Sequence, residues 1–149
     1  MTAPTDSRLA TAAALDAFAA WAIRTTATRD LSLTTAATLA TLDRDGPQRL
    51  SELALHEGVT QPSMTALVSR LERDGLAARG ADPSDGRAVV VSLTDAGREV
   101  LTARRSRRAA RLAALLDRLG PDDRAAVEAA AGALTRLTAA VDPVRGDRS

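Results

Sequence analysis

The stretch LAARGADPSDGRAVVVSL, from Leu76 to Leu93, decides the fold of this 149-residue chain. A short β-like segment, a tip rich in turn-forming residues and a β-branched return segment are typical of a two-stranded hairpin. A helix-like segment, VTQPSMTALVSRLERDG, occupies residues 59–75 directly before it. A short helix, a turn and a second helix followed at once by a hairpin indicate a winged helix-turn-helix, in which the hairpin is the wing.

The strands of this hairpin are expected in residues 77–79 and 88–93. Alternate residues of a strand share one face, so Val89, Val91 and Leu93 are predicted to point inward. The sequence therefore predicts one buried and one exposed face for the return strand.

The tip of the hairpin, residues 82–87, ends in an arginine. Asp85 precedes Arg87 by two residues, so its carboxylate can hold the guanidinium in one direction. An arginine held at a hairpin tip suits insertion into a DNA minor groove, where the potential is most negative at A·T-rich sequence. The alternative is an Asp–Arg pair that only closes the loop, and the two roles are compatible.

The segment before the hairpin has one apolar stripe and one polar face. Its apolar residues fall at steps of three and four, which predicts a helix over 61–74 with these residues in the core: Met64, Leu67, Val68 and Leu71. Its remaining positions are small, hydroxylated or basic, namely Gln61, Pro62, Ser63, Thr65, Ala66, Ser69, Arg70 and Arg73. Such a face suits the major groove, where short side chains allow close approach and hydroxyl, amide and guanidinium groups meet bases and phosphates. An ordinary solvated face is the alternative, and the neighbouring wing favours the DNA interpretation.

Helical periodicity continues on both sides of this unit. Further helices are expected over residues 8–28, 32–42, 51–57, 95–119 and 122–140. Hydroxyl side chains are predicted to cap four helices at their N-termini, namely Ser32, Ser51, Thr60 and Thr94. With a weak β segment before residue 51, the order is α-α-(β)-α-α-β-β-α-α. The expected class is mainly α with a small β-wing (α+β), a winged helix-turn-helix core flanked by helices.

Composition excludes several classes of protein. The absence of cysteine excludes disulfides, thiolate metal sites and thiol redox sensing. No apolar run approaches the roughly 18–20 residues of a membrane span, and no secretory leader pattern opens the chain. A soluble, cytoplasmic protein without membrane association is expected.

Charge by itself does not identify a partner, because the net charge is only +1. Residues 49–98 contain six arginines (49, 70, 73, 79, 87 and 98) and seven acids (52, 57, 72, 74, 82, 85 and 95). Any attraction to phosphate must therefore come from where the arginines lie.

Three motifs in this order resemble the multiple-antibiotic-resistance regulator (MarR) family. They are the S-R-L-E-x-x-G-L helix end at residues 69–76, the D-P-x-D-x-R wing at 82–87 and the L-T-x-x-G helix entry at 93–97. Each motif alone is weak, but together they cover about a third of the chain in the expected order and spacing. The flanking helix pattern extends the resemblance over most of the chain.

The resemblance implies a homodimer with one recognition helix in each of two major grooves. Residues 1–31 and 97–141 would form an interlocking helical dimerisation region and residues 32–96 the DNA-binding domain. Residues 142–149 are polar and are expected to form a disordered tail. In the matching positions, Arg87 would enter the minor groove, Asp85 would orient it and Arg70 would hold a phosphate.

By the same resemblance Ser63, Thr65 and Ala66 would face bases. Many members carry arginine or another long polar residue where this chain has Ala66. Base readout here would then rest on Gln61, Ser63, Thr65 and Ser69, or on DNA shape.

The function expected on these grounds is a homodimeric DNA-binding transcriptional regulator. It would be a repressor, bound to a near-palindromic operator and released by a small aromatic or phenolic ligand. Phe18 and Trp21, the only aromatic residues, could line the ligand pocket or anchor the core or dimer interface. The alternative is a winged-helix module that binds protein and not DNA.

Enzyme activity, a cofactor and a metal are not expected. No Ser-His-Asp grouping, nucleotide-binding loop or metal signature is present, and His56 is the only histidine. The arginines of residues 104–111 form a further basic cluster. It is interpreted as a solvated face paired with acids such as Asp117, Asp122 or Glu128, with contact to DNA outside the core site as the alternative.

Overall fold

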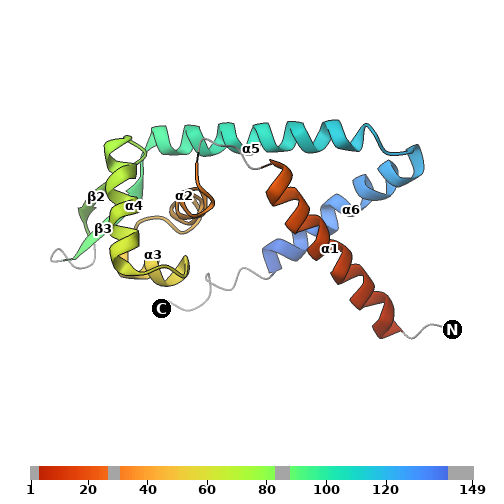
Figure 1. Ribbon diagram of the computed structural model, residues 1–149, viewed down its shortest axis with the longest axis horizontal. Coiled ribbons are helices and arrows are strands. Elements are labelled where there is room, and N and C mark those ends of the chain that lie inside the picture. Colours follow the sequence, from red (N-terminus) through yellow and green to blue (C-terminus); the bar gives the residue numbers. More distant parts are fainter. Residues whose placement is uncertain (1–3, 27–30, 83–87, 141–149) are drawn as a thin grey trace. The chain divides into compact units, whose positions relative to one another are not determined.

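The computed structural model describes residues 4–26, 31–82 and 88–140, and the chain divides into two compact units, residues 1–108 and 109–149. The described residues form, in chain order (Figure 1), α1 (Pro4–Thr26), α2 (Leu33–Asp45), β1 (Gln48–Arg49), α3 (Leu50–His56), α4 (Gln61–Arg73), β2 (Ala77–Ala81), β3 (Val89–Leu93), α5 (Asp95–Leu116) and α6 (Pro121–Ala140). The expected class, mainly α with a small wing, is confirmed.

Three of the four predicted N-caps are confirmed. The hydroxyl oxygen of Ser32 accepts from the Thr35 N–H at 3.1 Å, and that of Thr94 accepts from the Gly97 N–H at 3.0 Å. Thr60 caps α4 in the same way. Each cap satisfies a backbone donor that the first turn of a helix leaves free.

The prediction that Ser51 caps the third helix is wrong. The helix α3 begins at Leu50, and its N-cap is Arg49, whose backbone N–H donates to the Glu52 carboxylate at 3.1 Å. Arg49 is paired with Val90 in the sheet, and this pairing holds it in an extended conformation. The end of strand β1 therefore determines where the helix starts.

The three strands form an antiparallel sheet in the order β1-β3-β2. The strand β2 runs to Ala81, two residues beyond the predicted end, and the Asp82 N–H donates to the Ala88 carbonyl at 2.9 Å. The predicted inward orientation holds for Val91 and Leu93, which are buried, but not for Val89, which is 51% exposed. Val89 lies at the tip end of β3, beyond the residues that pair with β1, and is not part of the core.

One hydrophobic core joins the helix-turn-helix to the wing. Every residue of the predicted α4 stripe is buried in it, and Met64 and Val68 are fully buried. The other elements contribute Leu39, Leu42, Leu53, Ala54, Ala77, Val91, Leu93 and Leu101. Burial of the stripe forces the polar face of α4 outward.

Glycine ends the helix α4 where the wing begins. Gly75 has a φ of 72°, a left-handed conformation that most other residues adopt only at a cost. The Leu76 N–H then donates back to the Leu71 carbonyl at 2.8 Å, so the chain leaves the helix in a defined direction.

The helices α1 and α6 each leave large apolar side chains exposed. On α1 these include Leu9, Phe18 and Ile23, and on α6 they are Val127, Leu134 and Leu137. Among the described helices, none is both long enough and apolar enough to cross a membrane.

Candidate nucleic-acid interface

The outward face of α4 contains all the residues that the sequence assigned to the major groove. Each of them is exposed: Gln61, Pro62, Ser63, Thr65, Ala66, Ser69, Arg70 and Arg73. The face is shallow along its first two turns and becomes basic toward its C-terminal end. It thus allows close approach to the base edges and presents two arginines that can reach the DNA backbone.

The first turn of α4 is closed by its cap. The Thr60 hydroxyl accepts from the Ser63 N–H at 3.4 Å and lies 2.9 Å from the Ser63 hydroxyl. Pro62 has no N–H, so a phosphate at this end of the helix would depend on the Gln61 N–H and on side chains.

The two hydroxyl residues in the middle of this face have different partners. Thr65 donates its hydroxyl proton to the Gln61 carbonyl at 2.9 Å. Ser69 accepts from the Arg79 guanidinium at 3.3 Å. The same guanidinium pairs with the Glu72 carboxylate at 2.7 Å.

Arg79 is not among the site residues predicted from the sequence, although a signal for it exists. Arg79 is two residues after Ala77, which is buried in the core, so strand alternation places both on the side of the sheet that faces α4.

The arginines of α4 point away from the core. Among the residues that the structure describes, no ion pair engages the Arg70 guanidinium. Arg73 lies 3.8 Å from the Asp74 carboxylate, and both side chains are well exposed, so this pair is weak. Both guanidinium groups can therefore meet phosphates.

The base of the wing is tied to the start of α3. The Arg49 guanidinium donates to the Asp82 carboxylate, whose side chain is only 11% exposed. Asp85 and Arg87 lie outside the described residues, so their predicted pairing stays a prediction. No local signal in the sequence indicates that Arg49 is the partner of Asp82, 33 residues away.

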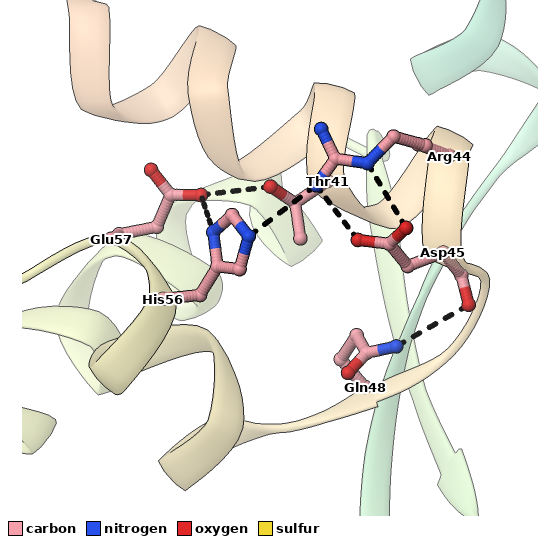
Figure 2. A network of polar contacts seen from close by, with 6 residues as sticks. All are labelled: Thr41, Arg44, Asp45, Gln48, His56 and Glu57. Atoms are coloured by element: carbon pink, nitrogen blue, oxygen red, sulfur yellow. Dashed lines mark hydrogen bonds and ion pairs between the residues drawn. The ribbon is translucent and has the colours of Figure 1, made fainter. Parts of the chain in front are cut away.

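A polar network joins the end of α2 to the end of α3 (Figure 2). The Thr41 hydroxyl donates to the Glu57 carboxylate at 2.9 Å, and Nδ1 of His56 lies 3.4 Å from the same oxygen. Nε2 of His56 lies 3.4 Å from the Arg44 guanidinium, which also pairs with Asp45. The histidine therefore joins two helices. In the described part of the chain no group of three His, Cys, Asp or Glu side chains is arranged to hold a metal.

The interpretation of residues 104–111 as a solvated face is wrong for Arg104, which is 4% exposed. Arg104 follows Gly97 and Leu101 at helical spacing, so it continues the buried stripe of α5. Arg105 pairs at 2.9 Å with Asp43 on α2, and not with an acid of the last helix.

The two aromatic residues form a pair on α1. Their ring centroids are 5.7 Å apart with an interplanar angle of 37°, and the Phe18 side chain is 53% exposed. The pair therefore presents apolar surface that α1 itself does not cover.

Comparison with known proteins places this geometry in one family. Residues 31–89 match the model of the MarR family. An HTH-type transcriptional regulator of Mycobacterium tuberculosis is 35% identical over 107 residues, which are 72% of this chain and 75% of that protein.

Solved structures agree with this placement. Transcriptional regulator Tm0710 from Thermotoga maritima has 27% identity and a TM-score of 0.62, covering 78% of this chain and 80% of its own. The PcaV transcriptional regulator from Streptomyces coelicolor, solved with its natural ligand, has 25% identity and a TM-score of 0.53, covering 88% and 90%.

Proposed function

The chain belongs to the MarR family of DNA-binding transcriptional regulators, and on that premise we propose that it is a homodimeric repressor. It binds a near-palindromic operator and is released from it by a small aromatic or phenolic ligand. The observation that carries the proposal is the exposed, shallow and arginine-ended face of α4, held on a rigid core beside the wing.

In this proposal the recognition helix α4 lies in the major groove. Its short polar residues meet base edges or allow close approach, namely Gln61, Pro62, Ser63, Thr65, Ala66 and Ser69. Arg70 and Arg73 bind phosphates, and Arg87 enters the minor groove with Asp85 to orient it. The exposure of every α4 residue in this set supports the assignment.

The placement of the charges explains how a nearly neutral domain can bind DNA. The pairs Arg79–Glu72 and Arg49–Asp82 each cancel one positive and one negative charge, whereas residues 61–79 carry three arginines against two acids. The local field at α4 is therefore more positive than the count over residues 49–98 indicates. This observation favours DNA over protein as the partner of the winged helix.

The dimer is proposed to form through residues 1–31 and 97–141, with the DNA-binding domain in 32–96. The exposed apolar residues of α1 and α6 support it, because a stable monomer rarely leaves such residues uncovered in series. A two-fold axis then requires half-sites about 10 base pairs apart.

The ligand is proposed to contact Phe18 and Trp21. An aromatic pair that is half-exposed at Phe18 and partly buried at Trp21 suits the stacking of a flat aromatic molecule. PcaV, of similar fold, was solved with its natural ligand, which supports a ligand site in this chain. Quenching of the single tryptophan by candidate phenolic acids, followed by loss of DNA binding at the same concentrations, is the expected result.

Selection of bound fragments from random DNA tests the main proposal. The full chain should enrich a near-palindrome, and its affinity should fall steeply with salt as phosphates are neutralised. Arg87→Ala should weaken operator binding by about 1–3 kcal/mol. Arg118→Ala, which removes the same charge at an exposed position of the last turn before α6, should leave binding unchanged. Equal affinity of Arg87→Ala and wild type would contradict the minor-groove role, and the absence of any enriched DNA would favour the protein-binding alternative.

A further inference from the structure

We propose that the recognition helix presents hydrogen-bond groups of opposite polarity at Thr65 and Ser69, and that Arg79 is the positioning residue that sets the polarity of Ser69. Thr65 then selects bases that donate, and Ser69 selects bases that accept. The inference rests on the proposed placement of α4 in the major groove and names the base chemistry that this helix reads.

The polarity of Thr65 follows from its bond to the helix backbone. Its single hydroxyl proton is engaged by the Gln61 carbonyl at 2.9 Å. The oxygen can offer only lone pairs to an outside group, and the γ-methyl lies beside it. In the major groove the donors are the N4 amine of cytosine and the N6 amine of adenine, so Thr65 favours these bases.

Ser69 has the opposite arrangement. Its oxygen accepts from Arg79 at 3.3 Å, and among the described residues its own proton makes no bond to the helix backbone. The proton is therefore available to an outside acceptor. The major-groove acceptors are O6 and N7 of guanine, O4 of thymine and N7 of adenine.

Glu72 keeps the Arg79 guanidinium in the position from which it donates to Ser69. The ion pair between them measures 2.7 Å, and the side chains are only 32% and 28% exposed. Because Arg79 comes from β2 and Glu72 from α4, the guanidinium is held over the helix from the neighbouring strand. The bond from Arg79 occupies one of the two lone pairs of the Ser69 oxygen and so favours the donor role; without it, the hydroxyl could rotate freely and act equally as donor or acceptor.

The spacing of the two residues predicts how far apart their bases lie. Thr65 and Ser69 are four residues apart, which is about 6 Å along a helix axis. Base pairs are stacked about 3.4 Å apart. Two selective positions, one or two base pairs apart within each half-site, are therefore expected.

Selection from a randomised half-site tests the inference with the full chain and three variants. Thr65→Val keeps the branched shape but loses the acceptor, so the preference for cytosine or adenine at one position should fall about five- to tenfold. Ser69→Ala should reduce the preference for an acceptor-bearing base at the other position by a similar factor. Arg79→Gln should relax only the position of Ser69 and leave that of Thr65 unchanged.

A matched control is available on α6. Thr135 donates its hydroxyl to the Ala131 carbonyl at 3.0 Å on an exposed helix face, as Thr65 does on α4. Thr135→Val should leave every base preference unchanged. Thermal melting of each variant shows that the fold is retained, and Thr65→Ser provides a second, milder change at the same position.

The outcomes separate this inference from the proposed function. If the wild type enriches a palindrome but Thr65→Val and Arg79→Gln enrich it unchanged, the polarity inference is wrong and the DNA-binding function stands. Selection of a base that donates, at the position read by Ser69, would also overturn the polarity inference. If the wild type enriches no sequence, both the operator-binding function and the inference fail.

Discussion

Arg49 directs two N–H groups at one carboxylate oxygen of Asp82, with Nε at 3.0 Å and Nη2 at 2.7 Å. Arg49 is at once the last residue of β1, the N-cap of α3 and a sheet partner of Val90. Asp82 is the residue at which the described part of the wing leaves β2. The pair therefore connects the direction of the wing to the start of the helix-turn-helix.

Loss of the Arg49–Asp82 pair should lower the affinity for the operator while it changes the free energy of unfolding only slightly. In Asp82→Asn the charge-assisted bonds to Arg49 become neutral, so the base of the wing is held less firmly. We expect operator affinity to fall about three- to tenfold, with a change of about 1 kcal/mol or less in the free energy of unfolding. Fluorescence anisotropy with labelled operator and urea denaturation measure the two quantities.

Asp74→Asn is the matched control for Asp82→Asn. It removes an acid from the exposed end of the recognition helix, where the Asp74 carboxylate, among the described side chains, pairs only with Arg73 at 3.8 Å. Removal of this negative charge should leave operator affinity unchanged or slightly higher. If Asp82→Asn behaves like Asp74→Asn, the pair with Arg49 does not position the wing.

Gly97→Ala should strongly destabilise the protein. A Cβ added at Gly97 would collide with the Leu76 carbonyl oxygen and come within 2.6 Å of Leu93 Cδ1, so α5 could not keep its approach to the wing. We expect a loss of about 2–3 kcal/mol in the free energy of unfolding, measured by urea denaturation.

Gly132→Ala tests whether that loss comes from the collision. Gly132 lies within α6, and an added Cβ would meet Arg136 Nη1 at 3.5 Å, an ordinary contact. Alanine there should stabilise the protein by about 0.5–1 kcal/mol, because it favours the helix more than glycine does. Similar effects of the two substitutions would contradict the close approach at Gly97.

Thr41→Val should destabilise the junction between α2 and α3. The Thr41 side chain is buried and donates to the Glu57 carboxylate at 2.9 Å, as Figure 2 shows, so valine would leave a charged acceptor short of one donor. The expected loss is about 1–3 kcal/mol in thermal or urea unfolding.

Thr38→Val provides the comparison for Thr41. Thr38 is fully buried in the same helix, but its hydroxyl donates only to the Thr34 carbonyl, at 2.9 Å. Valine fits this site, and no charged group loses a partner. Its effect should stay within about 1 kcal/mol. A loss at Thr38 as large as that at Thr41 would show that the bond to Glu57 contributes little.

Leu137→Glu should dissociate the proposed dimer. Leu137 is 51% exposed in the single chain, so in a monomer a charge there would have little effect. In a dimer interface it would bury an unpaired carboxylate and raise the dissociation constant more than tenfold. Sedimentation equilibrium measures the change, with Leu55→Glu on α3, at an 85% exposed position, as a control that should stay dimeric. A wild-type chain that is monomeric at micromolar concentration would refute the dimer.

The sequence by itself determined the features that depend on neighbouring residues. The stripe from Met64 to Leu71 follows from helical spacing, and the caps at Ser32, Thr60 and Thr94 follow from hydroxyls placed one residue before a helix. Each of these signals acts between residues no more than about two helical turns apart, so it holds where no contact with a distant segment overrides it. The exposed face of α4 follows from the same periodicity, while the DNA-binding roles of its residues and those of Asp85 and Arg87 stay predictions.

Only the tertiary structure decided the contacts between distant segments. Because Arg49 pairs with Val90, α3 starts at Leu50 and not behind a cap at Ser51. Packing along α5 buries Arg104, although the arginines of residues 104–111 were predicted to form a solvated face. Arg79 contacts Ser69 and Glu72 because β2 lies against α4. An arginine can pair with any of several acids, so the residues next to it in the sequence do not indicate its partner. The choice is made when the core brings particular strands and helices together.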